Sequence, residues 1–456
     1  MSDRSSRTFA AYAAETTWDR LPAETVHEVE RRVLDSIGVA LAGLDEGAPV
    51  AARRYAASHP GSANVWGTAD RADAEAAGFA NGVAVRALDF NDTYLSLEPL
   101  HPSDAIAALL ALAEVRGLPG RELIRAIAVS YEVSVCLCDA ASLRAHGWDH
   151  VAYLGIGAAC GAGALLGLAP ERIEDAISIA AVPHAAMRQT RAGELSMWKG
   201  AAAANAARHA AFGAAMAGAG MRGPFEPFEG EMGFIRQLLD GEPFADEPLK
   251  RLEALEPPTR ISDTYVKFWP VEYHAQSAVD AALRLHAQLA DRGIAAVRID
   301  TFGTSYEIIA KDPEKWDPRT RETADHSIQY IVCAALQDGE VTMRTFDPAR
   351  FRRLDTLELL QRHTSVEEDP ELTAGYPDGI PNRVTVTTAG DDVLTERVDH
   401  PRGHARNPMT DGELVAKFRA NVSERWPTDR AGRVERSAFG LHEDGGLERL
   451  IEELGP

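Results

Sequence analysis

The chain has 456 residues, of which 45% are hydrophobic and 25% charged, the composition of a soluble globular protein large enough for more than one domain. Its 69 Asp and Glu outnumber its 47 Lys and Arg, and the formal net charge of −22 argues against nucleic-acid binding, which needs a basic surface. No stretch has the length and apolarity of a signal peptide or a membrane-spanning helix, so we expect a cytoplasmic protein with no membrane partner. Its four cysteines are too few for a disulfide framework, and we expect buried thiols.

The first 240 residues are rich in Ala, Leu and Gly at helical spacing, which predicts a compact helical bundle. One predicted helix carries its apolar residues on a single face, at Val26, Val29, Val33, Ile37 and Leu41. Another should begin near the cap candidates Ser103 and Asp104 and end at Gly117. Residues 150–182 are typical of two helices broken at "GLAP", and "WKGAAAANAARHAAFGAAMAGAG" of a helix that other helices enclose.

From about Val271 the pattern changes. A helix predicted in "HAQSAVDAALRLHAQLADRG" precedes "IAAVRIDTFG", whose period-two pattern with β-branched residues predicts a strand. The later segment "NRVTVTTAGDDVLTERVDHPRG" predicts a hairpin that turns at "AGDD". We therefore expect an α+β domain at 271–405, inserted into a helical domain formed by 1–270 and completed by 406–456.

The common cofactor signatures are missing from the sequence: there is no G-x-G-x-x-G after a strand, no Walker loop, no H-E-x-x-H and no G-x-S-x-G. Polar residues gather instead in short islands, mostly before predicted buried helices. The first island places Asp89, Asp92, Thr93 and His101 just ahead of a helix that Pro102 suits as a first-turn residue. It forms either a capped turn or an active-site wall, where the helix dipole favours an anionic substrate.

The next two islands also precede predicted helices. "AHGWDHVAYLG" places His146 and His150 on either side of Asp149, where capping and catalysis are comparable alternatives. In "MRQTRAGELSMWKG", Lys199 follows two arginines and lies near the N-terminal end of its helix. A helix dipole disfavours a cation there, so the position favours a lysine that binds a carboxylate.

Three further islands follow, with a linker, a helix cap and a solvated loop as their structural alternatives. They contain Lys267, Glu272, Tyr273 and His274; then Asp325, His326, Ser327 and Tyr330; then Arg402, His404 and Arg406. Taken together, the islands supply cations that could hold carboxylates and His, Asp and Tyr groups that could move a proton. This inventory fits proton abstraction beside a carboxylate of a polyanionic acid. A non-catalytic protein that binds polycarboxylates is the alternative from a different class.

Several blocks of the chain resemble the MmgE/PrpD family, in order from about residue 20 to the C-terminus: "ALDFNDT", "HPSDAIAALLALAE", "GWDHVAYLGIGAACGAGALLGL", "KFWPVEYHAQSAVDAAL" and "WDPRTRETADHSIQYIVCAALQDGEVT". The resemblance implies a mainly α fold with a large all-helical domain and a smaller α+β lid domain. It further implies a homodimer, a small polycarboxylate substrate, a role in propionate catabolism, and catalysis with no metal and no organic cofactor.

Site roles follow from the resemblance by matching motif positions. The D-F-x-D-T, H-P-S and S-x-x-Y motifs, together with "GWDHV", assign the catalytic candidates Asp89, Thr93, His101, His150 and Tyr330. The lysine before the small-residue helix, the K-x-x-P segment and their neighbours assign the substrate-binding candidates Lys199, Lys267, Arg191, Glu272 and His274. His101, supported by Asp89, is the first choice for general base or acid, with His150 or Tyr330 as its partner.

Two departures within the family bear on the substrate. "GWDHV" and "PVEYH" resemble the branch that dehydrates methylcitrate, and "LSLEP" is longer than the matching loop of the decarboxylase branch. The resemblance therefore implies a hydro-lyase that converts 2-methylcitrate to 2-methyl-cis-aconitate. Decarboxylation of cis-aconitate and epimerisation of an amino-diacid, which use the same proton abstraction, remain alternatives.

Overall fold

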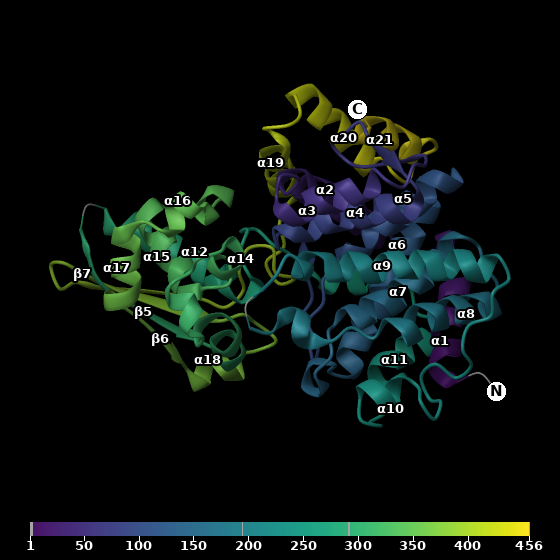
Figure 1. Cartoon of the computed structure of the whole chain (residues 1–456). Coiled ribbons are helices and arrows are strands. Elements are labelled where there is room, and N and C mark those ends of the chain that lie inside the picture. Colours follow the sequence, from purple (N-terminus) through teal and green to yellow (C-terminus); the bar gives the residue numbers. More distant parts are fainter. Residues whose placement is uncertain (1–2, 194, 291, 456) are drawn as a thin grey trace. The chain divides into compact units, whose positions relative to one another are not determined.

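The computed structural model describes residues 3–193, 195–290 and 292–455, and it divides into two compact units. The first comprises Met1–Thr264 and Thr410–Pro456, drawn mostly in purple, teal and yellow in Figure 1, and the second comprises Tyr265–Met409. The boundaries expected from the sequence, after residues 270 and 405, lie a few residues from these. In the described ranges, no helix combines the length and apolarity needed to cross a membrane.

The first unit is built almost entirely from helices, as predicted. They are α1 (Arg4–Glu15), α2 (Ala23–Ala42), α3 (Gly47–Ala56), α4 (Ala74–Ala87), α5 (Ile106–Arg116), α6 (Gly120–Ala140), α7 (Val151–Leu165), α8 (Pro170–Ala181), α9 (Trp198–Gly218), α10 (Phe234–Leu238), α11 (Asp246–Glu253), α19 (Asp411–Val422), α20 (Thr428–Phe439) and α21 (Gly446–Leu454). A two-residue antiparallel pair, β1 (Ala63–Asn64) and β2 (Arg71–Ala72), and the short β3 (Asp92–Thr93) complete the unit.

Small residues allow the central helices of this unit to pack at close range. α7 packs against α6 and α9, and α4 packs against α9. A Cβ placed on Gly157 of α7 would lie 1.9 Å from the Ser134 Oγ of α6, so this position accepts no larger side chain. The alanine-rich α9 is thereby enclosed, as its composition predicts, and the cysteines of the chain are buried and unbridged.

The C-terminal segment returns to the first unit, where α19 packs on α2. Lys417 of α19 makes an ion pair at 2.7 Å with Asp35 of α2 and donates a hydrogen bond at 2.9 Å to the carbonyl of Phe90. The last segment thus packs on the helical unit. These contacts also connect α19 to the loop that follows α4.

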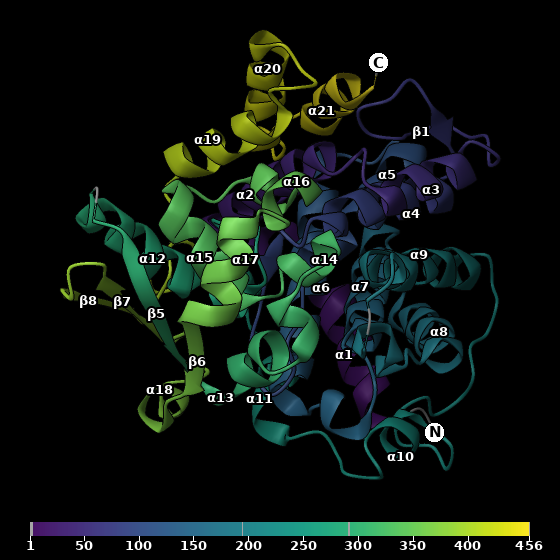
Figure 2. The same cartoon turned by 60° about the vertical axis from the view of Figure 1, so that its left-hand side comes forward.

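The second unit is an α+β structure around a four-stranded sheet of order β6-β5-β7-β8. Its strands are β5 (Ile294–Thr301), β6 (Thr364–Glu368), β7 (Asn382–Thr388) and β8 (Val393–Val398), with β5 and β6 parallel and the other neighbours antiparallel. The helices α12 (Gln276–Leu289), α15 (Ile328–Asp338) and α17 (Leu354–His363) pack together with the sheet around one core (Figure 2). Short elements complete it: β4 (Tyr265–Val266), α13 (Gly303–Ser305), α14 (Arg321–Ala324), α16 (Pro348–Phe351) and α18 (Pro370–Ala374).

The hairpin of β7 and β8 confirms the predicted turn, with Thr387 opposite Val393. Residues along β7 alternate between buried and partly buried, the period-two pattern on which the prediction depended. β6 was not predicted, because its polar residues, Thr364–Glu368, lack a buried apolar alternation. Its pairing with β5 comes from the fold rather than from its local pattern.

Candidate active site

The first predicted island forms the connection from α4 to α5. Asp89 follows the end of α4 with a φ of 51°, a left-handed conformation that Asp tolerates better than most residues. The chain then forms a narrow loop closed by two backbone hydrogen bonds between Tyr94 and Leu100. His101 precedes Pro102, which begins a 3₁₀ turn leading into α5. In this geometry the polar side chains of the first island point into the interior of the first unit, where they are buried.

Four side chains of this unit form a connected buried network. Asp89 accepts hydrogen bonds from Arg86 through Oδ1 and from Lys199 Nζ at 3.1 Å through Oδ2. The other end of the Arg86 guanidinium donates from Nη2 to the Nε2 of His101 at 2.9 Å. Asp89 is therefore connected to His101 through Arg86, a link that the sequence did not indicate. Lys199, one residue into α9, is buried against an acidic partner, in keeping with its predicted position.

The partners of His101 define its tautomer. Its Nδ1 contacts the carbonyl oxygen of Asp92 at 2.7 Å, and a carbonyl only accepts. Its Nε2 contacts a guanidinium, which only donates. These two contacts fit an imidazole with its proton on Nδ1 and its Nε2 lone pair directed at Arg86. A lone pair on a buried neutral ring is what a general base requires.

Thr93 and Asp92 have structural partners. The Thr93 hydroxyl donates to the Leu100 carbonyl at 3.1 Å, so it closes the loop before His101. Asp92 is fully buried and accepts from the Ser103 backbone N–H at 3.0 Å and from the Tyr131 hydroxyl at 2.7 Å. Both residues thus hold the backbone around His101. These contacts support a positioning role for Thr93 more than the catalytic role expected for it.

Asp104 adds a second carboxyl to this network. Its Oδ1 accepts from Asn91 at 2.9 Å, and its Oδ2 lies 3.7 Å from Arg86 Nε. Burial raises the pKa of Asp104 to about 7, against the opposing effect of Arg86. The carboxyl beside Arg86 is therefore partly protonated near neutral pH.

His150 has the same arrangement of partners as His101. Its Nδ1 lies 3.3 Å from Asp149 Oδ1, and Arg191 Nη2 lies 3.3 Å from its Nε2. Burial, reinforced by the charge of Arg191, lowers the pKa of His150 to about 3, so this ring is neutral at physiological pH. The two imidazole centroids are 5.8 Å apart. The first unit thus brings together two predicted histidines from segments almost fifty residues apart.

Arg191 is occupied by protein partners. Its Nε makes an ion pair at 3.0 Å with Asp149 Oδ2, in addition to the contact with His150. Burial alone would raise the pKa of Asp149, but His150 and Arg191 outweigh it and lower that pKa. Arg191 therefore orients Asp149 and His150, a different role from the direct substrate binding expected from the sequence.

The second unit holds a separate cluster of predicted residues. Glu272 contacts the His274 Nδ1 at 2.8 Å and accepts from the His274 backbone N–H at 2.7 Å. Burial would raise the pKa of Glu272, but His274, His326 and Lys267 outweigh it and lower the pKa to about 2. His274 Nε2 is buried and has no hydrogen-bond partner in the described ranges. This cluster retains an ionised carboxylate, a buried lysine and an imidazole nitrogen available to a ligand.

Tyr330 lies in the core of the second unit. It is fully buried, near Phe346, and its hydroxyl donates to the Thr345 carbonyl. Burial raises the pKa of Tyr330 above its usual value. The hydroxyl is thus engaged by a backbone carbonyl, and the catalytic role expected for Tyr330 stays a prediction.

Comparison with known proteins accounts for most of the chain. The pattern of the MmgE/PrpD N-terminal domain matches residues 7–247, and that of the MmgE/PrpD C-terminal domain matches residues 269–439. The chain belongs to the MmgE/PrpD family. The family resemblance drawn from the sequence motifs is therefore confirmed.

Three relatives of this MmgE/PrpD chain illustrate the range of named activities. A 2-methylcitrate dehydratase from Cupriavidus necator is 32% identical over 405 residues, which cover 81% of this chain and 79% of the relative. A 2-methylcitrate dehydratase from Escherichia coli K12 is 31% identical over 401 residues, covering 82% and 80%. A cis-aconitate decarboxylase from Homo sapiens is 30% identical over 473 residues, covering 96% and 92%.

The sequence did not identify Arg86 as a residue of this site. It also did not indicate that Asp104 lies beside Arg86. Arg86 precedes Asp89 by three residues at the end of α4, and this i,i+3 spacing was a usable signal for the pair. Asp104 was interpreted only as a helix cap. His404, for which a solvated loop was expected, is in fact buried beside Tyr265.

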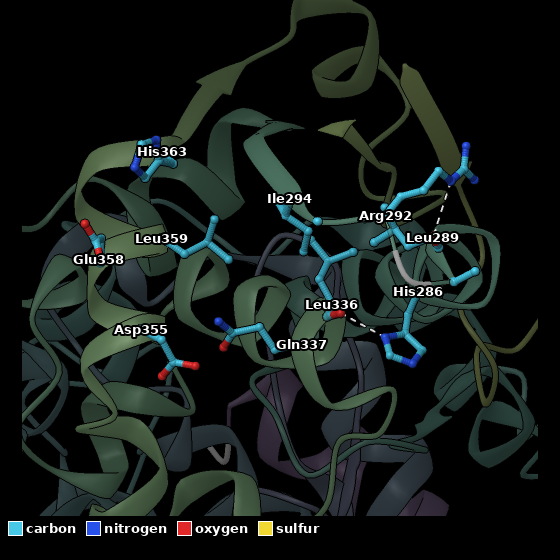
Figure 3. Close-up of a pocket in the computed structure, with 12 residues that line it drawn as sticks. His286, Leu289, Arg292, Ile294, Leu336, Gln337, Asp355, Glu358, Leu359 and His363 are labelled. Atoms are coloured by element: carbon cyan, nitrogen blue, oxygen red, sulfur yellow. Dashed lines mark hydrogen bonds between the residues drawn. The ribbon is translucent and has the colours of Figure 1, made fainter. Parts of the chain in front are cut away.

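A separate cavity of about 470 Å³ lies in the second unit of the MmgE/PrpD chain (Figure 3). Its lining includes His286, Arg292, Asp355 and His363. His286 donates a hydrogen bond from Nδ1 to the Leu336 carbonyl at 2.8 Å. None of the predicted site residues lines this cavity.

Proposed function

We propose that the protein is a hydro-lyase that dehydrates 2-methylcitrate to 2-methyl-cis-aconitate. The observation that carries the proposal is the pair of neighbouring buried histidines, His101 and His150, each with its Nε2 facing a guanidinium. Relatives with more than 30% identity over about four fifths of this chain carry the name 2-methylcitrate dehydratase.

Dehydration requires a base, an acid and cations that stabilise a carboxylate, and this network contains side chains of these kinds. A base removes a proton from the carbon next to a carboxylate, the hydroxyl on the neighbouring carbon leaves with a proton as water, and a carbon–carbon double bond forms. Negative charge develops on the carboxylate during proton removal, and nearby cations stabilise it. Lys199 and Arg86 supply fixed positive charge beside His101.

We assign proton removal to the His101 Nε2 lone pair, which is released when Arg86 Nη2 turns from the ring to a substrate carboxylate, with Asp89 as the residue that positions Arg86. His150 is neutral in the free protein, and a bound polyanion would favour its protonation by adding negative charge nearby. In this assignment His150 then gives the proton to the leaving hydroxyl. The catalytic pair therefore comes from His101 and His150, without Tyr330.

Lys267, Glu272 and His274 are our proposed second group of substrate-binding residues. The buried lysine provides a positive charge for a carboxylate, and the His274 Nε2 provides a hydrogen-bonding position without a protein partner in the described ranges. Lys267→Met should raise KM for the tricarboxylate more than it lowers kcat. An unchanged KM would remove Lys267 from this group.

The activity is tested with purified, EDTA-treated protein and 2-methylcitrate, by the ultraviolet absorbance of the unsaturated product. We expect turnover after EDTA treatment, because we propose that neither a metal nor an organic cofactor takes part. Activity that depends on added metal would contradict this part of the proposal. No absorbance increase with either 2-methylcitrate or citrate would overturn the dehydratase assignment. Light scattering on the same preparation tests the homodimer that we propose.

Decarboxylation of cis-aconitate is the second candidate, because the relative with the longest match among those described above is named cis-aconitate decarboxylase. It would use the same cations and histidines. Carbon dioxide release from cis-aconitate, without turnover of 2-methylcitrate, would favour the decarboxylase. Formation of 2-methyl-cis-aconitate without carbon dioxide would favour the dehydratase.

A further inference from the structure

Arg188 lies close enough to His150 for its charge to help lower the pKa of that ring. The segment that carries it pairs with the segment leading to His150: the Asp149 N–H donates to Ala186 at 2.8 Å, and the Arg188 N–H donates to Gly147 at 3.1 Å. Arg188 and Arg191 are the first and last residues of a 3₁₀ helix. Side chains at i and i+3 of a 3₁₀ helix lie on the same face, so Arg188 lies on the face from which Arg191 reaches His150.

The guanidinium of Arg188 pairs with no carboxylate in the part of the chain that the structure describes. Within the described residues, its side chain makes neither a hydrogen bond nor an ion pair, although it is half-buried. Burial and the neighbouring Arg144 lower its pKa, and Arg191 acts in the same direction. A half-buried cation without a partner costs stability, since a charge taken from water needs compensation.

Glu98 is the carboxyl that most raises the pKa of Arg188, but it is poorly suited to compensate the charge. Glu98 is fully buried, and its Oε2 accepts from Ser142 Oγ at 3.0 Å and from the Arg144 backbone N–H at 2.8 Å. Its Oε1 has no hydrogen-bond partner in the described ranges. Burial raises the pKa of Glu98 to about 7, so this group is partly neutral at physiological pH. The N–H donors of the Arg188 guanidinium can therefore bind an anion from outside the protein.

Resting on the proposed function, we propose that Arg188 binds a carboxylate of the tricarboxylic acid substrate, beside His150. Arg191 already contacts Asp149 and His150, whereas the guanidinium of Arg188 has no such partner among the described residues and can bind a ligand. A planar guanidinium binds a carboxylate through two parallel hydrogen bonds, which gives orientation as well as affinity. Arg188 thus determines the preference for a substrate with a third carboxylate over a dicarboxylate.

The direct test measures binding without turnover, by calorimetry with propane-1,2,3-tricarboxylate, which has no hydroxyl group to eliminate. Arg188→Gln should raise the Kd for propane-1,2,3-tricarboxylate at least about tenfold. Arg188→Lys keeps the charge but loses the two parallel N–H donors, so its Kd should lie between those of wild type and Arg188→Gln. Arg116→Gln, at an exposed arginine of α5, is the matched control and should leave the Kd unchanged. Glutarate, a dicarboxylate, should bind wild type and Arg188→Gln with similar affinity.

With 2-methylcitrate, Arg188→Gln should raise KM more than it lowers kcat. Equal Kd values for Arg188→Gln and Arg116→Gln would overturn the proposal, as would wild-type protein that does not bind the tricarboxylate. Binding that depends on Arg188 in a protein without dehydratase activity would instead refute the proposed function and leave the Arg188 site standing. Circular dichroism and melting of each variant show that it is folded.

Discussion

The Nη2 of Arg86 lies 2.9 Å from the Nε2 of His101, while Nη1 of the same guanidinium binds Asp89. One arginine therefore connects the acidic group to the proposed base and also settles which nitrogen of that base carries the proton. Histidine and aspartate both belong to motifs visible in the sequence. The connection between them depends on an arginine at the end of α4 that neither motif includes.

Arg86→Gln should lower kcat for dehydration about a hundredfold or more, because the proposed base loses the partner that holds its ring. The change also leaves Asp89 with one fewer cation, so we expect a stability loss of about 3 kcal/mol. The double variant Arg86→Gln/Asp89→Asn should recover part of the stability but none of the activity. The ¹⁵N shifts of the His101 ring report the tautomer directly, and an unchanged tautomer with full kcat would remove Arg86 from the mechanism.

His150 should remain neutral far below its ordinary pKa in the free protein, since burial and Arg191 oppose its protonation. Its ring resonances should stay constant from pH 8 to about pH 4, and Arg191→Gln should raise the pKa. Because the folded-state pKa is below the unfolded one, the stability linked to His150 is complete above about pH 6.5 and is lost as pH falls toward 3. A titration midpoint near 6.5 would contradict this prediction.

Asp104 should affect stability with the opposite sign. Its folded-state pKa of about 7 exceeds the unfolded value, so its contribution is complete below about pH 4 and is lost as pH rises to 7. Between these limits the group lowers the free energy of unfolding by about 1.4 kcal/mol for each pH unit. Asp104→Asn should reduce this slope in denaturant titrations at several pH values. Glu98→Gln provides a comparison at a second carboxyl whose pKa is raised. If the free energy of unfolding changes with pH equally in wild type and Asp104→Asn, Asp104 is ionised throughout this range.

Tyr330→Phe should leave kcat within about twofold of wild type, because the hydroxyl is used for a hydrogen bond to the Thr345 carbonyl. The lost hydrogen bond should lower the free energy of unfolding by about 1 kcal/mol. His101→Gln is the contrasting variant, and its kcat should fall at least about a hundredfold. A large loss of kcat in Tyr330→Phe with unchanged stability would restore Tyr330 as a catalytic residue.

The predictions that the structure confirms depend on local patterns. The apolar face of α2, the break between α7 and α8, the small residues of α9 and the alternation along β7 are all properties of neighbouring residues. Periodicity reports which side of an element is buried, so these elements could be predicted without knowing what packs on them. β6 escaped prediction because its residues are polar and its partner β5 lies far away in the chain.

The sequence by itself determined the family, the helical character of most of the chain and the polar segments from which a site could be built. The tertiary structure decided the role of each polar residue. It engaged Arg191 with Asp149, gave Arg188 no partner among the residues that the structure describes, and placed Tyr330 in a core. The physical reason is that the charge and hydrogen bonding of a buried group depend on partners from distant segments, such as Lys199 for Asp89 across 110 residues of chain.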